Sequence, residues 1–229
     1  MFDGSLPPKP ASNGNPARPP LSGRRNQKGL PSTMTSKRFS LLLTAALLLT
    51  ASALAQVQSW KIDPNHTAAQ FSVRHMGIST VRGAFTKVSG TAEYDPATPA
   101  KSSVEVTIEA ASVDTRVEMR DNDLRSANYF DVAKYPTITF KSKSVQAAGE
   151  GKLKIVGDLT IHGVTKEVTL DVEGPSKPMN DPRGNTHVGA SAGTTVKRTD
   201  FGVGSANPMV GDEISITIDV ELVRPAAAK

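Results

Sequence analysis

The sequence contains no cysteine, and this absence excludes several classes of function. Without thiols there is no disulfide framework, no thiolate metal ligand and no catalytic thiol. Histidine occurs only four times, and no H-x-H or H-E-x-x-H pattern places two imidazoles at the spacing of a metal site. We therefore expect neither a metal nor a cofactor. Aromatic residues make up 5% of the chain, with a single Trp, so a core must be built largely from aliphatic side chains.

Long apolar runs are also lacking. The longest, residues 39–54, contains Ser and Thr and falls short of the roughly 20 apolar residues that a membrane-spanning helix needs. It follows Lys37 and Arg38 and ends in Ala53-Leu54-Ala55, which is typical of a secretory signal peptide with an A-x-A cleavage site. The sequence predicts a signal peptide over residues 34–55, cleavage after Ala55, and a periplasmic or secreted product with no membrane span.

The segment ahead of this signal has a different composition. Residues 1–33 contain seven of the 16 prolines and almost no apolar periodicity. Such a segment cannot bury enough surface to fold. We interpret it as a disordered extension or as residues upstream of the true start at Met34, and we expect the folded domain over residues 56–229.

Positive charge is concentrated ahead of the predicted domain. Residues 1–55 hold seven of the 27 basic residues and one of the 22 acidic residues, which leaves 20 basic and 21 acidic side chains in residues 56–229. The formal charge of +5 therefore comes from the N-terminal part, and the domain itself is close to neutral. A domain of this kind lacks the basic surface that nucleic acids require, so we expect no nucleic-acid partner.

Alternation of apolar and polar residues dominates residues 56–229 and predicts β-strands with one apolar face each. In the clearest example, Val104, Val106 and Ile108 alternate with Glu105 and Thr107. The pattern, strong or weak, predicts about eight strands, over residues 66–76, 79–94, 102–110, 135–145, 151–161, 166–174, 187–203 and 213–223.

One segment breaks the alternation. Residues 115–128 begin with Thr115-x-x-Glu118, the spacing of a capping box, and predict a helix of two or three turns. So short a helix cannot cover a sheet, and the strands must therefore bury their apolar faces against one another. Such strands form a sandwich or a closed barrel, and closure also removes exposed edges. We predict an all-β fold, an eight-stranded antiparallel barrel with one short helix near an opening. Eight strands enclose an interior able to hold one small ligand.

The side chains predicted to face the barrel interior are the candidates for ligand contact. Their modest size is compatible with two alternatives, an internal void that a ligand could fill and a fully packed core. The candidates are Phe71, Val73, Phe85, Val106, Ile108, Ile138, Phe140, Leu159, Ile161, Leu170, Phe201, Ile216 and Ile218. A polar head group is expected at the mouth, where a charge need not be desolvated, near Arg74, His75 or Arg198.

Two short motifs formally point to chemistry. His162 and Gly163 stand between two predicted strands, which is typical of a hairpin connection. Ser191 lies in Gly-Ala-Ser-Ala-Gly over residues 189–193, which matches the G-x-S-x-G nucleophile elbow, but that elbow requires a parallel α/β sheet. We therefore interpret His162 as a turn residue. Residues 189–193 are interpreted as small residues that let a strand bend or another group approach.

Two other functions compete with ligand binding. An enzyme could use His66 or His75 with a carboxylate such as Asp63 or Asp200, provided that two such groups lie within hydrogen-bond reach in an open pocket. The two histidines are nine residues apart, so on one strand they point to opposite faces, and a metal site would need distant strands. The second rival is a packed, ligand-free β domain that acts through its surface. A homodimer is a further possibility for each function.

The arginines around the predicted helix allow two interpretations. Arg116, Arg120 and Arg125 alternate with Asp121 and Asp123. Such charges usually form a solvated face with weak ion pairs. The functional alternative is a cationic rim that receives an anionic head group.

Four stretches, in order along the chain, resemble one family. Residues 60–85 carry Asp-Pro-x-His, a strand ending in Arg-His and then Gly-x-Phe; residues 120–140 form a helix-to-strand element; residues 157–172 form a hairpin; and residues 197–203 carry Arg-x-Asp-Phe-Gly. Together they resemble the YceI-like proteins, periplasmic lipocalin-type barrels associated with polyisoprenoid and other long-chain lipid binding. Asp123 departs from the pattern, since many members have His there, and no role of that histidine is carried over.

The resemblance implies a binding protein and not an enzyme. Its ligand would be a long-chain apolar lipid, polyisoprenoid or quinone-like, held for transport, storage or stress protection. The resemblance also places His162 in a hairpin and outside any catalytic set.

Overall fold

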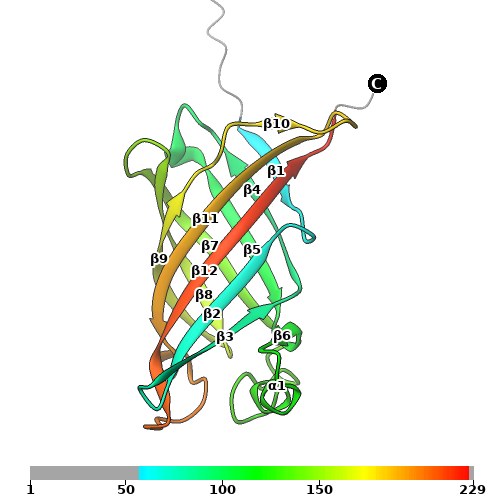
Figure 1. Ribbon diagram of the computed structural model, residues 1–229. Helices are drawn as coiled ribbons and strands as arrows, with labels where there is room; N and C mark the ends of the chain where they lie inside the picture. Colours follow the sequence, from blue (N-terminus) through cyan, green and yellow to red (C-terminus); the bar gives the residue numbers. More distant parts are fainter. Residues whose placement is uncertain (1–56, 227–229) are drawn as a thin grey trace, which may run out of the picture. The chain divides into compact units, whose positions relative to one another are not determined.

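Aliphatic side chains alternate with polar ones along the chain, and the resulting strands curl into a closed barrel (Figure 1). The computed structural model describes residues 57–226. The strands are β1 (Gln58–Ile62), β2 (Ala68–His75), β3 (Ser79–Phe85), β4 (Val88–Tyr94), β5 (Ser103–Glu109), β6 (Val113–Asp114), β7 (Thr137–Ala147), β8 (Lys152–Ile161), β9 (Val164–Glu173), β10 (Met179–Asn180), β11 (Thr186–Lys197) and β12 (Val210–Arg224). The helices are α1 (Glu118–Arg125) and the short 3-10 turns η1 (Pro99–Lys101), η2 (Ala110–Ser112) and η3 (Arg198–Phe201).

Eight long strands form the barrel wall. Three of these strands are interrupted, and each of the three therefore carries two labels, β1 and β2, β3 and β4, or β5 and β6. β1 and β2 lie end to end along one edge of β12. β4 pairs with β1, and β3 pairs with β2. β5 then pairs with β4, and β6 pairs with β3. From there each strand pairs with the next, through β7, β8, β9 and β11, and β11 pairs with β12 to close the ring. All pairings are antiparallel. The predicted eight-stranded barrel with one short helix is confirmed.

The connection between β8 and β9 is a two-residue hairpin, as predicted for His162. Ile161 pairs with Val164, and the two residues between them have positive φ angles of 52° at His162 and 75° at Gly163. Positive φ at both central positions is the geometry of a type I′ turn, whose twist matches that of the strands. The ring of His162 packs edge-on against Tyr135 at 4.5 Å. This histidine therefore has a structural place in the turn.

α1 lies at one end of the barrel, beside β6 (Figure 1), but the predicted capping box does not form. The helix begins at Glu118 after Val117, and no side chain caps it. Thr115 instead bonds the buried Asp121: its amide and hydroxyl donate to Oδ1 at 2.8 and 2.5 Å. A carboxylate inside the helix gives two donors of Thr115 one strong acceptor, and this interaction replaces the cap.

The arginines of the helix region tie it to the barrel. Arg120 donates to the hydroxyl and the carbonyl of Thr115 at 2.7 and 2.9 Å. Arg125 donates to the carbonyls of Ala111 and Val113 at 2.8 and 2.6 Å. These guanidinium groups therefore bind main-chain oxygens, which is a structural role that neither interpretation of the sequence included.

The long connection between β11 and β12 is organised by the buried side chain of Arg198. Its guanidinium donates to four main-chain oxygens at 2.9–3.2 Å, those of Val203, Ser205, Val210 and Gly211. Arginine suits this role because its planar fork presents five donors in fixed directions. The side chain is only 6% exposed, so each of these bonds replaces water that the carbonyls would otherwise bind.

Two sequence-based expectations fall outside residues 57–226. They are the disordered or misassigned extension over residues 1–33 and the signal peptide over residues 34–55. Within the described range, no helix combines the length and hydropathy that a membrane crossing demands.

Gly157 provides a test of how closely β7 and β8 approach. A Cβ atom there would lie 2.5 Å from the ring of Phe140 and 2.6 Å from the carbonyl oxygen of Lys141. We expect Gly157→Ala to lower the free energy of unfolding by about 1–3 kcal/mol, since overpacked strands must move apart. Gly193→Ala is the matched control, because its nearest atom would be 3.7 Å away. Urea denaturation of both variants checks this, and equal stabilities would contradict the close approach.

Arg198 provides a second test. Lysine keeps the positive charge but cannot reach four carbonyls with one ammonium group. We expect Arg198→Lys to lower the free energy of unfolding by about 2–4 kcal/mol, because buried acceptors lose their donors. Arg82→Lys, at an exposed position of β3, should change stability by less than about 0.5 kcal/mol. A variant Arg198→Lys as stable as the wild type would show that the four bonds contribute little.

Candidate ligand-binding cavity

The barrel encloses a cavity of about 280 Å³. Apolar side chains from all eight wall strands line it, because every second residue of each strand points inward. The volume is near the lower end of the range of roughly 300–1,000 Å³ that is usual for ligand pockets. The core is therefore not fully packed, and the space inside it suits a slender apolar molecule.

The predicted interior side chains lie on the wall of this cavity. Neighbouring strands bring them together: Val106 pairs with Phe140, and Phe140 in turn pairs with Leu159. The lining includes Phe71, Val73, Phe85, Val106, Ile108, Ile138, Phe140, Leu159, Ile161, Leu170, Phe201, Ile216 and Ile218. Their contact with a ligand stays a prediction.

Side chains from α1 and the loop after it also line the cavity, and sequence reasoning missed them. Leu124, Tyr129 and Phe130 contribute to the wall at the helix end. The ring of Phe130 packs edge-on against Phe85 at 5.6 Å, and Phe85 lies 5.8 Å from Phe71. These aromatic contacts fix the helix-end loop against the barrel, so the cavity is covered there by ordered side chains.

The opposite part of the cavity wall contains Trp60, which the sequence candidates also omitted. Its indole is 2% exposed and packs with Ala92 and Val188, while Arg224 lies over the ring at 4.9 Å. Trp60 Nε1 is buried without a hydrogen-bond partner within the described residues. Alternation with Ile62 along β1 was the signal that could have identified this position.

The three residues predicted to contact a head group do not lie together in the structure. Arg198 lines the cavity, but most of its donors bind main-chain oxygens. Arg74 and His75 lie at the end of β2 and do not line the cavity, and the Arg74 guanidinium donates to Thr80 Oγ1 at 2.7 Å and to the Gly77 carbonyl at 2.6 Å. The contact of Arg74, His75 and Arg198 with a head group stays a prediction.

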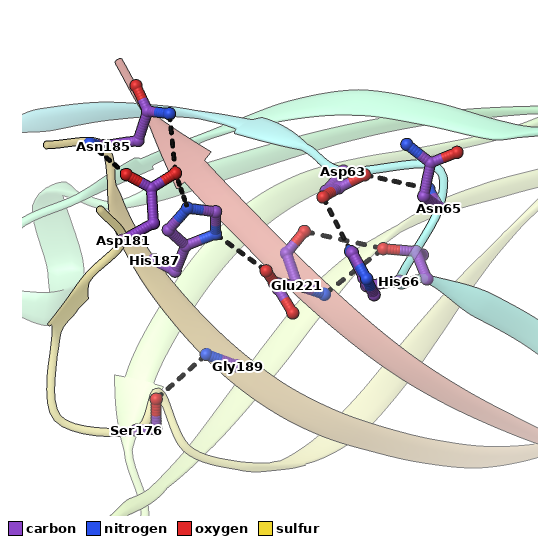
Figure 2. Close-up of polar contacts among 10 residues, drawn as sticks. Asp63, Asn65, His66, Ser176, Asp181, Asn185, His187, Gly189 and Glu221 are labelled. Carbon is purple, nitrogen blue, oxygen red and sulfur yellow. Dashed lines mark hydrogen bonds and ion pairs between the residues drawn. The ribbon is translucent and has the colours of Figure 1, made fainter. Parts of the chain in front are cut away.

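A second group of polar residues lies on the outer face of the barrel (Figure 2). We call the side chains of Asp63, His66, Asp181, His187 and Glu221 the outer cluster. His66 Nδ1 lies 2.9 Å from Asp63 Oδ2. His187 bridges two carboxylates, with Nδ1 2.7 Å from Glu221 Oε1 and Nε2 3.3 Å from Asp181 Oδ2. The sequence alone does not predict the contact of His187 with Glu221, because no local pattern indicates a partner 34 residues away.

The carboxylates and histidines of the outer cluster shift one another's pKa values. The hydrogen bond that His66 donates to the Asp63 carboxylate raises the pKa of His66, and the bond that His187 donates to Glu221 is the main cause of the raised pKa of His187. Desolvation alone would raise the pKa of Asp181. The bonds from Asn185, His187 and the Arg183 amide outweigh it and lower this pKa to about 2. The cluster therefore favours ionised carboxylates and protonated imidazoles.

The outer cluster meets the condition set for an enzyme, since two of the named groups pair beside an open outer hollow. His66 and Asp63 lie within hydrogen-bond reach, beside a shallow outer hollow that Ser191 also borders. The Ser191 hydroxyl donates to Asp219 at 2.7 Å, and within residues 57–226 no serine contacts His66. The other named groups, His75 and Asp200, form no such pair in the same part of the chain. The outer cluster thus offers an oriented imidazole without a nucleophile.

The Gly-Ala-Ser-Ala-Gly motif lies in the middle of β11, as a continuous antiparallel strand. Ser191 pairs with Asp219 of β12 and Glu173 of β9, while Ala190 and Ala192 line the cavity. No strand-to-helix turn surrounds this serine, so the structure agrees with the interpretation of a strand built from small residues.

Known proteins share this sequence and architecture. Residues 60–222 match the YceI-like domain family. Protein YceI of Escherichia coli O157:H7 is 38% identical over 190 residues, which cover 82% of this chain and 98% of that protein.

Solved structures give the same answer for the fold. The Campylobacter jejuni YCEI protein superimposes with a TM-score of 0.60 and 34% identity, covering 67% of this chain and 90% of that one. A polyisoprenoid binding domain from Saccharophagus degradans, implicated in plant cell wall breakdown, superimposes with a TM-score of 0.55 and 17% identity, covering 74% and 100%. The family match, the identity to its members and the shared barrel lead to one conclusion: this chain belongs to the YceI-like family.

Proposed function

We propose that this protein binds one long-chain apolar lipid inside the barrel. The observation that carries the proposal is the apolar cavity of about 280 Å³, lined from all eight wall strands. Each methylene group buried there contributes about 0.8 kcal/mol, so a chain gains affinity without specific polar contacts. The small volume favours a ligand with a single slender chain over a lipid with several.

A polyisoprenoid or a quinone with an isoprenoid tail is the ligand class that we favour. The Saccharophagus degradans domain with the same fold is described as polyisoprenoid binding, and the family resemblance in the sequence points the same way. A chain with methyl branches would pack against aliphatic walls and the rings of Phe71, Phe85 and Phe140. Transport, storage or protection of such a lipid would each use the same cavity.

Binding, and not catalysis, is the activity that this geometry supports. Two charged residues line the cavity, Glu93 and Arg198, and four main-chain oxygens engage the guanidinium of Arg198. An acid–base reaction needs titratable groups within reach of the substrate. The His66–Asp63 pair lies on the outer face, so it would not reach a lipid inside the barrel.

Filling the cavity tests the proposal. Ala192→Phe adds a ring at a lining position of β11, whereas Ala147→Phe adds the same ring at an exposed position of β7. Organic extraction and mass spectrometry of the purified wild type should release one isoprenoid chain lipid. We expect Ala192→Phe to lose most of this lipid, because ring and ligand compete for the same space, and Ala147→Phe to retain it.

Trp60 gives an independent readout, since it is the single Trp of the sequence and lies on the cavity wall. Titration of delipidated protein with a polyprenol or an isoprenoid quinone should change its fluorescence. A folded Ala192→Phe variant with full lipid occupancy would contradict an internal site. Recovery of fatty acids alone would contradict the isoprenoid assignment and leave the cavity in place.

We also propose that the protein is exported, with cleavage after Ala55. The support is the basic head, the Leu/Ala-rich run and the small residues Ala53 and Ala55. Intact-mass measurement on periplasmic material should give a chain that begins at Gln56. A secreted or periplasmic chain that still contains residues 41–49 would contradict the cleavage.

A further inference from the structure

We propose that the outer cluster is a binding site for one divalent transition-metal ion, with Asp63, His66 and Glu221 as its protein ligands. Figure 2 shows Asp63 and His66 in the bend between β1 and β2, and Glu221 beside them on β12 with its carboxylate turned toward His187. Their ligand atoms all lie within 4.8 Å of one another. The site lies outside the barrel, and the proposal is independent of the lipid in the cavity.

The backbone holds the two halves of the site together. Pro64 has no N–H to donate to a sheet, so the chain leaves the strand at the bend that carries Asp63 and His66. The bend is fixed to Glu221 on both sides: the Asp63 amide donates to its carbonyl at 2.9 Å, and the Glu221 amide donates to Thr67 Oγ1 at 3.2 Å. The ligands therefore stand on ordered backbone, as a specific metal site requires.

The distances suit a small rotation onto a metal ion. Zn²⁺ binds His nitrogen and carboxylate oxygen at about 2.0–2.2 Å, so two ligand atoms in a tetrahedral site lie roughly 3.3–3.6 Å apart. The pair Asp63 Oδ2 and His66 Nδ1 is now at 2.9 Å, and the other pairs are within 4.8 Å. His66 is 63% exposed, which leaves its ring free to turn and leaves room for water at a fourth position.

The negative charge of the three carboxylates in the outer cluster also favours the binding of a cation. Three carboxylates gather here, and among the ion pairs of residues 57–226 none links them to Lys or Arg. The lysines of the other pairs bind carboxylates elsewhere on the barrel. His187 contacts both Glu221 and Asp181, so it would orient the ligand carboxylate from behind, as groups behind metal ligands commonly do.

The mixed ligand set selects the class of metal. Imidazole favours Zn²⁺, Co²⁺, Ni²⁺ or Cu²⁺ over hard cations, whereas Ca²⁺ needs six to eight oxygen ligands. This proposal departs from the expectation drawn from the sequence, which considered only ligand spacing along the chain. The fold brings Glu221 close to Asp63 and His66, because Glu221 lies on β12, which pairs with β1 and β2.

The test uses untagged protein treated with EDTA and then titrated with Zn²⁺ by calorimetry and with Co²⁺ by visible absorption. We expect one equivalent of either ion to bind and to raise the melting temperature. His66→Gln and Glu221→Gln should each weaken binding by more than about tenfold. His75→Gln is the matched control, since its imidazole lies at the end of β2 away from the site, and it should bind as the wild type does.

Several outcomes would overturn the site. They are the absence of saturable binding, binding that His66→Gln or Glu221→Gln leaves unchanged, and equal loss in His75→Gln. Circular dichroism checks that each variant remains folded. Should Glu221→Gln fail to fold, Asp63→Asn replaces it as the decisive carboxylate variant, and unchanged Zn²⁺ affinity in that variant would contradict the assignment.

Discussion

The pairing of β12 on both of its edges is the constraint on which the rest of the structure depends. One edge binds β11 from Thr186↔Arg224 to Lys197↔Glu213, and the other edge binds β1 and β2. A sheet that closes in this way leaves no long edge to attract another chain and must place one face of every strand inside. The same closure produces both the apolar interior and the outward positions of His187 and Glu221.

Strand pattern carried most of the fold prediction, because alternation reports directly which face of a strand is buried. The thirteen candidate side chains lie on the cavity wall, but β1, β6 and β10 were not predicted, and Phe201 lies in η3 and not in the strand predicted over residues 187–203. The capping box at Thr115 was wrong, since the buried Asp121 attracts both donors of that residue. A spacing rule that considers only local backbone cannot foresee such competition.

The missing parts of the site depend on contacts far apart in the chain. The wall at the helix end comes from Tyr129 and Phe130, in a loop without periodicity. The outer cluster joins His66 to a strand about 150 residues later, and its second histidine finds its carboxylate only through the register of β11 and β12. No pattern within one segment contains this information, because strand register is set by the closed sheet as a whole.

The short side chains of β11 have a consequence for how the barrel can change. This strand contributes Val188, Ala190, Ala192, Thr194 and Val196 to the wall, while β8 contributes the larger Leu153, Ile155, Leu159 and Ile161. The width of the cavity beside β11 is thus set by small side chains. The main-chain hydrogen bonds of β11 do not depend on the size of these side chains. Adding a carbon atom to a lining side chain of this strand would narrow the cavity, and removing one would widen it. Related barrels can therefore adapt to thinner or thicker ligand chains while their main-chain hydrogen bonds stay the same.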